Sequence, residues 1–106
     1  MRDERTTKYK GDFERVKREH FSGKQFCAIC GITKKIHIHH IIPYRLTHDN
    51  SLDNLIPLCA THHVIMEKTT KRFVDNTQDY DAAKFMLNVM FRARQIETLN
   101  AIIESQ

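Results

Sequence analysis

Cysteine and histidine residues occur in this chain at the spacings of metal ligands. Cys27 and Cys30 form a Cys-x-x-Cys pair, and Cys59 and His62 repeat the same spacing further along. Two such pairs can complete a tetrahedron around one zinc ion, because zinc binds thiolate and imidazole equally naturally. We predict a closed structural Zn²⁺ site from these four residues. The alternatives are buried thiols without a metal, or a redox Cys-x-x-Cys, for which the surrounding βαβ pattern is missing.

A second set of histidines stands beside the first site. His39 and His40 are adjacent, and His63 directly follows His62. Neighbouring helix residues point about 100° apart, so His62 can face the zinc while His63 faces elsewhere. Histidines suit a divalent ion with open positions, and a neutral imidazole suits a general base. These are the groups that phosphodiester hydrolysis needs, since a metal polarises the phosphoryl oxygen. The alternative is that these histidines are ordinary surface residues.

Short elements must bring these histidines together. Alternation at residues 36–39 predicts a strand that runs out near Pro43, and residues 54–59 predict a second short strand with Pro57 at an edge or break. A polar, turn-like segment at 44–53 separates them. Successive strand residues point to opposite faces, so His39 and His40 can flank one substrate only where the strand ends, twists or bulges. A helix is expected from about residue 60 to 72.

We expect one helix before and one helix after the segment that carries the metal-ligand residues. Residues 1–11 lack a periodic apolar pattern and are expected to be loosely packed, while Asp12 can cap a short helix. Residues 73–80 have the composition of a linker. We therefore divide the chain into a basic N-terminal segment with a short helix (1–24), a metal-binding domain (25–72), and a linker with a C-terminal helix (73–106).

The last segment has the pattern of a long amphipathic helix. Asp79 or Asp81 can cap it, and it is expected to reach about Glu104. Arg92 interrupts its apolar stripe. The stripe consists of Phe85, Val89, Ile96, Leu99 and Ile103, widened by Met86, Met90 and Ala93. We expect this helix to pack on the domain or on another copy of itself.

Size and charge narrow the class of protein. A chain of 106 residues builds a modest core, which a structural metal commonly supplements. Residues 1–24 and 25–72 each carry a net charge of +3, whereas residues 73–106 carry −2. This suits a polyanion such as nucleic acid, although an ordinary solvated surface gives the same balance. We find no signal-peptide core and no apolar run long enough for a bilayer. A cytoplasmic protein with reduced thiols is expected.

The order of these motifs resembles the HNH endonuclease family in its zinc-bearing form. The matching text is Cys-x-x-Cys, then residues 38–43 (Ile-His-His-Ile-Ile-Pro), then Asn54-Leu55, then residues 58–63 (Leu-Cys-Ala-Thr-His-His), followed by Lys68-Thr69. The resemblance covers about residues 27–69. It implies an α+β fold: a small ββα-metal, treble-clef-like domain with a structural zinc site, carrying flanking helices and the long C-terminal helix.

The resemblance also implies roles for single residues. His39 and His63 are expected to bind a catalytic divalent ion such as Mg²⁺, Mn²⁺, Ni²⁺ or Zn²⁺. His40 is expected to act as general base, and Asn54 to brace the loop between the strands. Most zinc-bearing relatives have Cys where this chain has His62, and imidazole can replace that thiolate. The implied reaction is hydrolysis of DNA to 5′-phosphate and 3′-hydroxyl ends.

Partners follow from the same reasoning. Double-stranded DNA is the expected substrate, no membrane is expected, and a homodimer or protein partner is expected to use residues 81–104. A bacterial or phage-encoded protein is the expectation from the resemblance. Candidate phosphate contacts are Lys34, Lys35, Arg45, Lys68, Lys71 and Arg72. Two alternatives stay open: a zinc-stabilised nucleic-acid-binding module without catalysis, and a protein-interaction adaptor.

Overall fold

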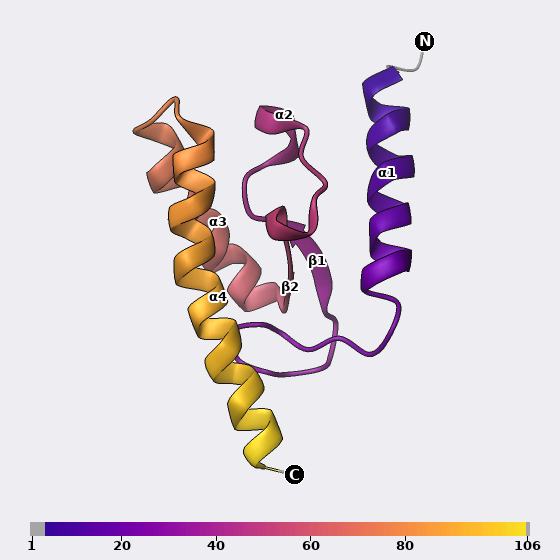
Figure 1. Cartoon of the computed structure of the whole chain (residues 1–106), viewed down its shortest axis with the longest axis vertical. Helices are drawn as coiled ribbons and strands as arrows, with labels where there is room; N and C mark the ends of the chain where they lie inside the picture. Colours follow the sequence, from indigo (N-terminus) through magenta and orange to yellow (C-terminus); the bar gives the residue numbers. More distant parts are fainter. Residues whose placement is uncertain (1–3, 106) are drawn as a thin grey trace.

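A small two-stranded sheet lies between helices in this chain. The structure, a computed structural model, describes residues 4–105, with side chains from Asp12 onward. In chain order the elements are α1 (Glu4–His20), β1 (His37–His40), α2 (Tyr44–Thr47), the 3-10 helix η1 (Leu52–Asn54), β2 (Leu55–Leu58), α3 (Ala60–Asp75) and α4 (Tyr80–Glu104) (Figure 1). The α+β class with a long C-terminal helix is thereby confirmed. None of the helices within residues 4–105 combines the length and the apolar character that crossing a bilayer requires.

The sheet consists of β1 and β2, which pair antiparallel with His40 opposite Leu55. All of β2 is buried, whereas His37 in β1 is exposed and the rest of β1 is half-buried. Beyond the last pair, the backbone N–H of Ile41 donates to the carbonyl oxygen of Asn54 at 2.8 Å. The chain bends at residues 41–42. The strand therefore ends directly after His40. Because the strict alternation of side chains stops there, His39 and His40 can face the same site.

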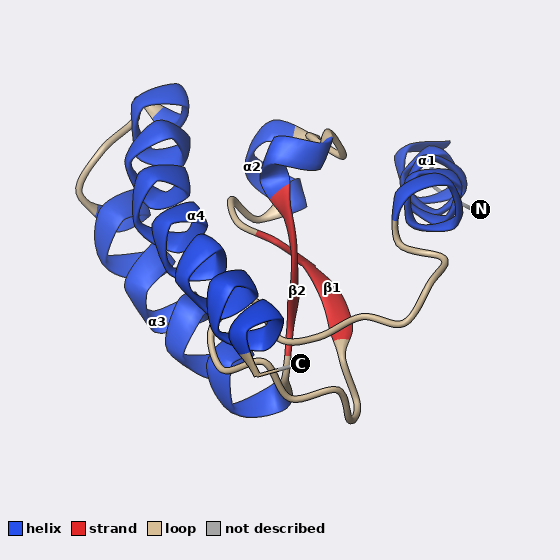
Figure 2. Cartoon of the chain, turned by 60° about the horizontal axis from the view of Figure 1, so that its bottom comes forward, coloured by secondary structure: helices blue, strands red, loops and turns tan. Residues whose placement is uncertain are grey.

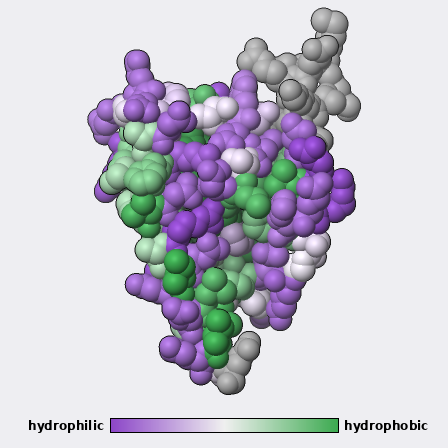
Figure 3. Space-filling view, viewed as in Figure 1, coloured by the Kyte–Doolittle hydropathy of each residue, from purple (hydrophilic) through white to green (hydrophobic). Residues whose placement is uncertain are grey.

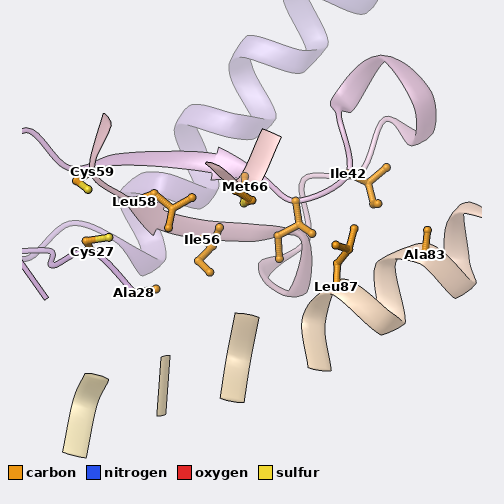
Figure 4. Packing of buried hydrophobic residues seen from close by; sticks show 10 residues of the cluster. Cys27, Ala28, Ile42, Ile56, Leu58, Cys59, Met66, Ala83 and Leu87 are labelled. Atoms are coloured by element: carbon orange, nitrogen blue, oxygen red, sulfur yellow. The ribbon is translucent and has the colours of Figure 1, made fainter. Parts of the chain in front are cut away.

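The helices lie on both sides of this sheet. In Figures 1 and 2, α3 and α4 run together on one side, and α1 stands on the other. The core lies between the sheet, α3 and α4 (Figure 4), where Leu58, Met66 and Leu87 are among its buried side chains. Thr70 of α3 donates through its hydroxyl to the carbonyl oxygen of Ile41 at 3.2 Å. This bond ties α3 to the end of β1.

Several expected boundaries are wrong. The first helix begins at Glu4 instead of Asp12, while residues 1–3 lie outside the described residues. The segment at 44–53, expected to be turn-like, contains α2 and most of η1. The expected linker at 73–80 shrinks to 76–79, because α3 continues to Asp75 and Asp79 already caps α4 by accepting from the N–H of Ala82 at 3.0 Å.

The face of α4 that packs on the domain is not the apolar stripe seen in the sequence. Phe85 is 67% exposed and Ile103 is 64% exposed, whereas Leu87 is fully buried. Figure 3 shows hydrophobic side chains gathered on the surface over the C-terminal half of α4. Arg92, which interrupts the apolar stripe, lies on the face that packs. Its guanidinium donates to the carbonyl oxygens of Leu52 and Leu55 at 3.1 and 2.9 Å. These bonds and the burial of Leu87 together hold this face of α4 against the domain.

Replacing Leu87 with Ala tests which face of α4 is anchored. We expect Leu87→Ala to lower the free energy of unfolding by about 3 kcal/mol, because it opens a cavity in the core. Leu99→Ala makes the same chemical change at a side chain of 39% exposure. It should cost less than about 1 kcal/mol. Denaturant unfolding at fixed free Zn²⁺ measures both, and equal losses would contradict the orientation described above.

Candidate metal centre and active site

Four ligand atoms converge where the first turn meets the start of α3. Each of Cys27, Cys30, Cys59 and His62 offers one atom, and these atoms all lie within 4.8 Å of one another. The Cys30 and Cys59 sulfurs are 3.9 Å apart, and Nδ1 of His62 lies 3.2 Å from Cys59 Sγ. Sulfurs around a tetrahedral zinc, at about 2.3 Å from the metal, are about 3.8 Å apart. The cluster therefore has the size and donor set to bind a metal such as zinc.

Local backbone geometry forms the first half of this cluster. The N–H of Gly31 donates to the carbonyl oxygen of Cys27, and the N–H of Cys27 donates to the carbonyl oxygen of Ile32, both at 2.8 Å. Gly31 has φ of +81°, a conformation that side-chain-bearing residues seldom adopt. This tight turn brings the two thiols of the Cys-x-x-Cys pair to one side.

The second half of the cluster lies at the start of α3. Cys59 is the N-cap residue of this helix, and the N–H of His63 donates to its carbonyl oxygen at 2.9 Å. Although burial raises the pKa of the Cys27 thiol, the backbone N–H groups of Cys59, Cys30 and Ile29 lower it below the ordinary value overall. This favours the charged form of Cys27, which is the form that binds a metal.

A separate cavity of about 590 Å³ has His39, His40 and His63 in its wall, and none of the four cluster residues lines it. The rings of His39 and His63 are stacked, with centroids 3.5 Å apart and planes 11° from parallel. Burial, then the neighbouring histidines His63, His37 and His40, lowers the pKa of His39 to about 4. His39 is therefore neutral at neutral pH, with a ring lone pair that can bind a cation.

His40 lies in the same cavity but has different neighbours. Its Nε2 is 2.7 Å from Oδ1 of Asn50, and its ring meets that of Phe13 edge-on, with centroids 4.6 Å apart. Burial lowers the pKa of His40, while the hydrogen bond to Asn50 and the charge of Asp49 act in the opposite direction. A neutral imidazole at the wall of a cavity can accept a proton from a water molecule there.

Asn54 is fully buried beneath this site. Its Oδ1 accepts from the N–H of Ile42 at 2.9 Å, and its Nδ2 donates to the carbonyl oxygens of Ile42 and Asp49 at 3.1 and 2.9 Å. One side chain thus joins the bend after β1 to the segment before η1. This geometry suits the bracing role expected of Asn54.

The sequence reasoning missed three neighbours of these histidines. Asn50 and Phe13 contact His40, and Glu67 Oε1 lies 2.9 Å from His63 Nε2. The four-residue spacing of His63 and Glu67 on a helix could have indicated that contact. No comparable local signal pointed to Asn50 or Phe13, because both reach His40 from other segments. Glu67 adds a carboxylate beside His63 at the cavity wall.

The candidate phosphate contacts divide into groups. Arg45 and Lys71 line the cavity, and Lys71 also pairs with Asp75 at 2.7 Å. Arg72 lines a different hollow, between α3 and the start of α4. The exposed Lys34, Lys35 and Lys68 line none of these hollows. The structure thus brings two of the six predicted cations to the histidines.

The comparison with protein families agrees with this site. The model of the HNH endonuclease family matches residues 27–69, from the Cys27/Cys30 pair into α3. The resemblance is confirmed for this segment and indicates a nuclease or nucleic-acid-binding function with a metal site. The matched segment leaves out α1 and α4. No significant match was found among curated proteins or solved structures.

Metal removal should unfold the protein if the cluster holds a structural zinc, since binding such a metal is part of folding. We expect one tightly held Zn²⁺ per chain and a loss of α-helical circular dichroism with a strong chelator. His62→Cys should keep the tight zinc, because thiolate replaces imidazole, and His62→Ala should weaken it. Metal content by mass spectrometry of the native protein measures both. Tight zinc retained in a Cys27→Ser, Cys59→Ser double variant would contradict the assignment.

Removing the Asn54 side chain should destabilise the fold. Asn54→Ala leaves buried backbone groups without their partners, which we expect to cost about 3 kcal/mol. The control is Asn100→Ala on the exposed surface of α4, which should change the unfolding free energy by no more than about 0.5 kcal/mol. Denaturant titrations at fixed free Zn²⁺ compare the two, and equal stabilities would refute the bracing role.

Proposed function

We propose that this protein is a metal-dependent DNA endonuclease that hydrolyses phosphodiester bonds, with residues 25–72 as its catalytic domain. The observation that carries the proposal is the convergence of His39, His40 and His63 on one cavity. The family match over residues 27–69 supports the same reaction class.

His39 and His63 are the proposed ligands of a catalytic divalent ion such as Mg²⁺, Mn²⁺, Ni²⁺ or Zn²⁺. Their donor chemistry fits, because His39 is neutral at working pH and the Glu67 carboxylate adds negative charge beside His63. Such an ion supplies polarisation of the phosphoryl oxygen and stabilises the charge on the leaving oxygen. Two imidazole ligands leave positions for substrate and water.

His40 is the proposed general base. It takes one proton from a water molecule as the water oxygen forms a bond to phosphorus. The bond from phosphorus to the 3′ oxygen then breaks, and that oxygen keeps the electron pair and takes up a proton from solvent. The products are a 5′-phosphate and a 3′-hydroxyl. Arg45 and Lys71, which line the cavity, are the best placed of the predicted cations for phosphate contacts.

The runner-up is a zinc-stabilised nucleic-acid-binding module without catalysis. It accounts for the Cys/His cluster and the basic charge of residues 1–72, but it gives no role to three histidines at one cavity. The two functions differ in a direct assay, because only the nuclease changes its substrate.

Cleavage of supercoiled plasmid tests the proposal. We expect wild-type protein to cut with Mg²⁺, Mn²⁺ or Ni²⁺ and to stop cutting with EDTA. His40→Ala should lower the rate at least about 100-fold, because general-base catalysis is lost. His20→Ala is the control histidine, since His20 is exposed on α1 and is absent from the cavity wall. It should cut as the wild type does.

The outcomes separate the two functions. DNA that stays intact with folded, zinc-loaded wild-type protein and all three metals would contradict the nuclease. If wild type and His40→Ala then bound DNA equally, the binding module would stand.

A protein partner on the 81–104 helix is a further proposal from the sequence. The exposed Phe85, Val89 and Ile103 support it, because large apolar side chains gathered on a surface are typical of contact sites. Sedimentation velocity over a range of concentrations tests the homodimer. A monomer at high concentration would leave only a partner of another kind.

A further inference from the structure

The hydrogen bond between His40 and Asn50 fixes which ring nitrogen carries the proton. Nε2 of His40 and Oδ1 of Asn50 are 2.7 Å apart. An amide oxygen accepts and cannot donate, so Nε2 is the donor in this pair. In a neutral imidazole that carries its hydrogen on Nε2, the ring lone pair is on Nδ1. The contact with Asn50 therefore selects Nδ1 as the basic atom.

We propose that Asn50 is a positioning residue for His40, holding the ring in the tautomer and orientation in which Nδ1 takes the proton from the attacking water. This inference rests on the proposed nuclease function. Asn50 does not touch the reacting atoms; it acts through His40.

The segment that carries Asn50 is anchored on both sides, as a positioning role requires. The carbonyl oxygen of Asp49 accepts from Nδ2 of the buried Asn54 at 2.9 Å. Its carboxylate accepts from the N–H of Ser51 at 2.9 Å and from Nζ of Lys84 at 2.6 Å. Lys84 also pairs with Asp53 at 2.9 Å, and its side chain is only 19% exposed. Asn50 thus sits in a short loop that is held by α4.

The same arrangement stabilises the charge that the reaction creates. When His40 takes up a proton, both ring nitrogens become donors. Nε2–H can then donate more strongly to Asn50, because hydrogen bonds from charged donors are the stronger ones. An acceptor that fixes the tautomer of a base and steadies its protonated form is a known way to raise a rate without touching the substrate.

Two substitutions of Asn50 separate this role from a structural one. Asn50→Leu keeps a similar volume but removes the acceptor, and Asn50→Asp keeps an acceptor oxygen. We expect Asn50→Leu to lower the single-turnover cleavage rate by about 10- to 100-fold, with DNA affinity in EDTA and the melting temperature unchanged. Asn50→Asp should restore most of the rate. Asn100→Leu, on the exposed surface of α4, is the control for introducing a leucine and should leave the rate unchanged.

A second readout does not depend on activity. In the zinc-loaded protein, ¹⁵N chemical shifts should report His40 in the Nε2–H tautomer for wild type and a mixture of tautomers for Asn50→Leu. Wild-type rate and an unchanged tautomer in Asn50→Leu would overturn the inference. If wild type fails to cut but the tautomer still depends on Asn50, the nuclease proposal fails while the positioning of His40 stands. Loss of rate in both Asn50→Leu and Asn50→Asp with an unchanged tautomer would also overturn it.

Discussion

The Cys/His cluster is the constraint on which the remaining geometry depends. Its four ligands come from a turn before the sheet and from the junction of β2 with α3, so one ion would fix the positions of both segments. His62 and His63 are neighbours in the first turn of α3 and point about 100° apart. Fixing His62 toward the cluster therefore fixes the direction of His63, which stacks on His39 at the cavity. A chain with so small a core has few other means of fixing the rotation of a helix. In small domains of this kind, metal binding also supplies a large share of the folding free energy.

Polar contacts attach α4 to this framework, which explains why its apolar stripe is exposed. Arg92 donates to two carbonyl oxygens around η1, those of Leu52 and Leu55. Thr98 and Arg94 donate to the carbonyl oxygen of Ile29, within the Cys-x-x-Cys turn, at 3.1 and 3.2 Å. These donors act together with the buried Ala83 and Leu87 in setting the rotation of the helix. A helix outside the segment matched by the family model thus supports both the cluster and the loop that carries Asn50.

The sequence was informative where local spacing determines geometry. The Cys-x-x-Cys turn, the paired spacing of Cys59 with His62, and the capping of α4 by Asp79 depend on residues a few positions apart, and all can be recognised from the chain alone. The contacts of His40 with Asn50 and Phe13 could not be, because they join segments through the bend after β1 and the path of α1. The rotation of α4 could not be predicted for a related reason: the exposed stripe contradicts its packing on the domain but not on another copy of the chain. Hydrophobic periodicity reports which residues are apolar, whereas the face that packs carries Leu87 and Arg92, whose partners lie in segments distant in sequence.

The charges around the histidines set the limits within which such a site can work. Burial, and then the neighbouring imidazoles of His63, His37 and His40, lowers the pKa of His39. A cation held by His39 and His63, as proposed, would lower the basicity of His40 nearby. The hydrogen bond to Asn50 and the negative charge of Asp49 oppose that effect. Asp49 keeps its charge because, although burial raises its pKa, hydrogen bonds from Lys84 and Ser51 lower it below the ordinary value. The ion pair between Lys84 of α4 and Asp49 of the loop therefore affects His40 through electrostatics as well as through position.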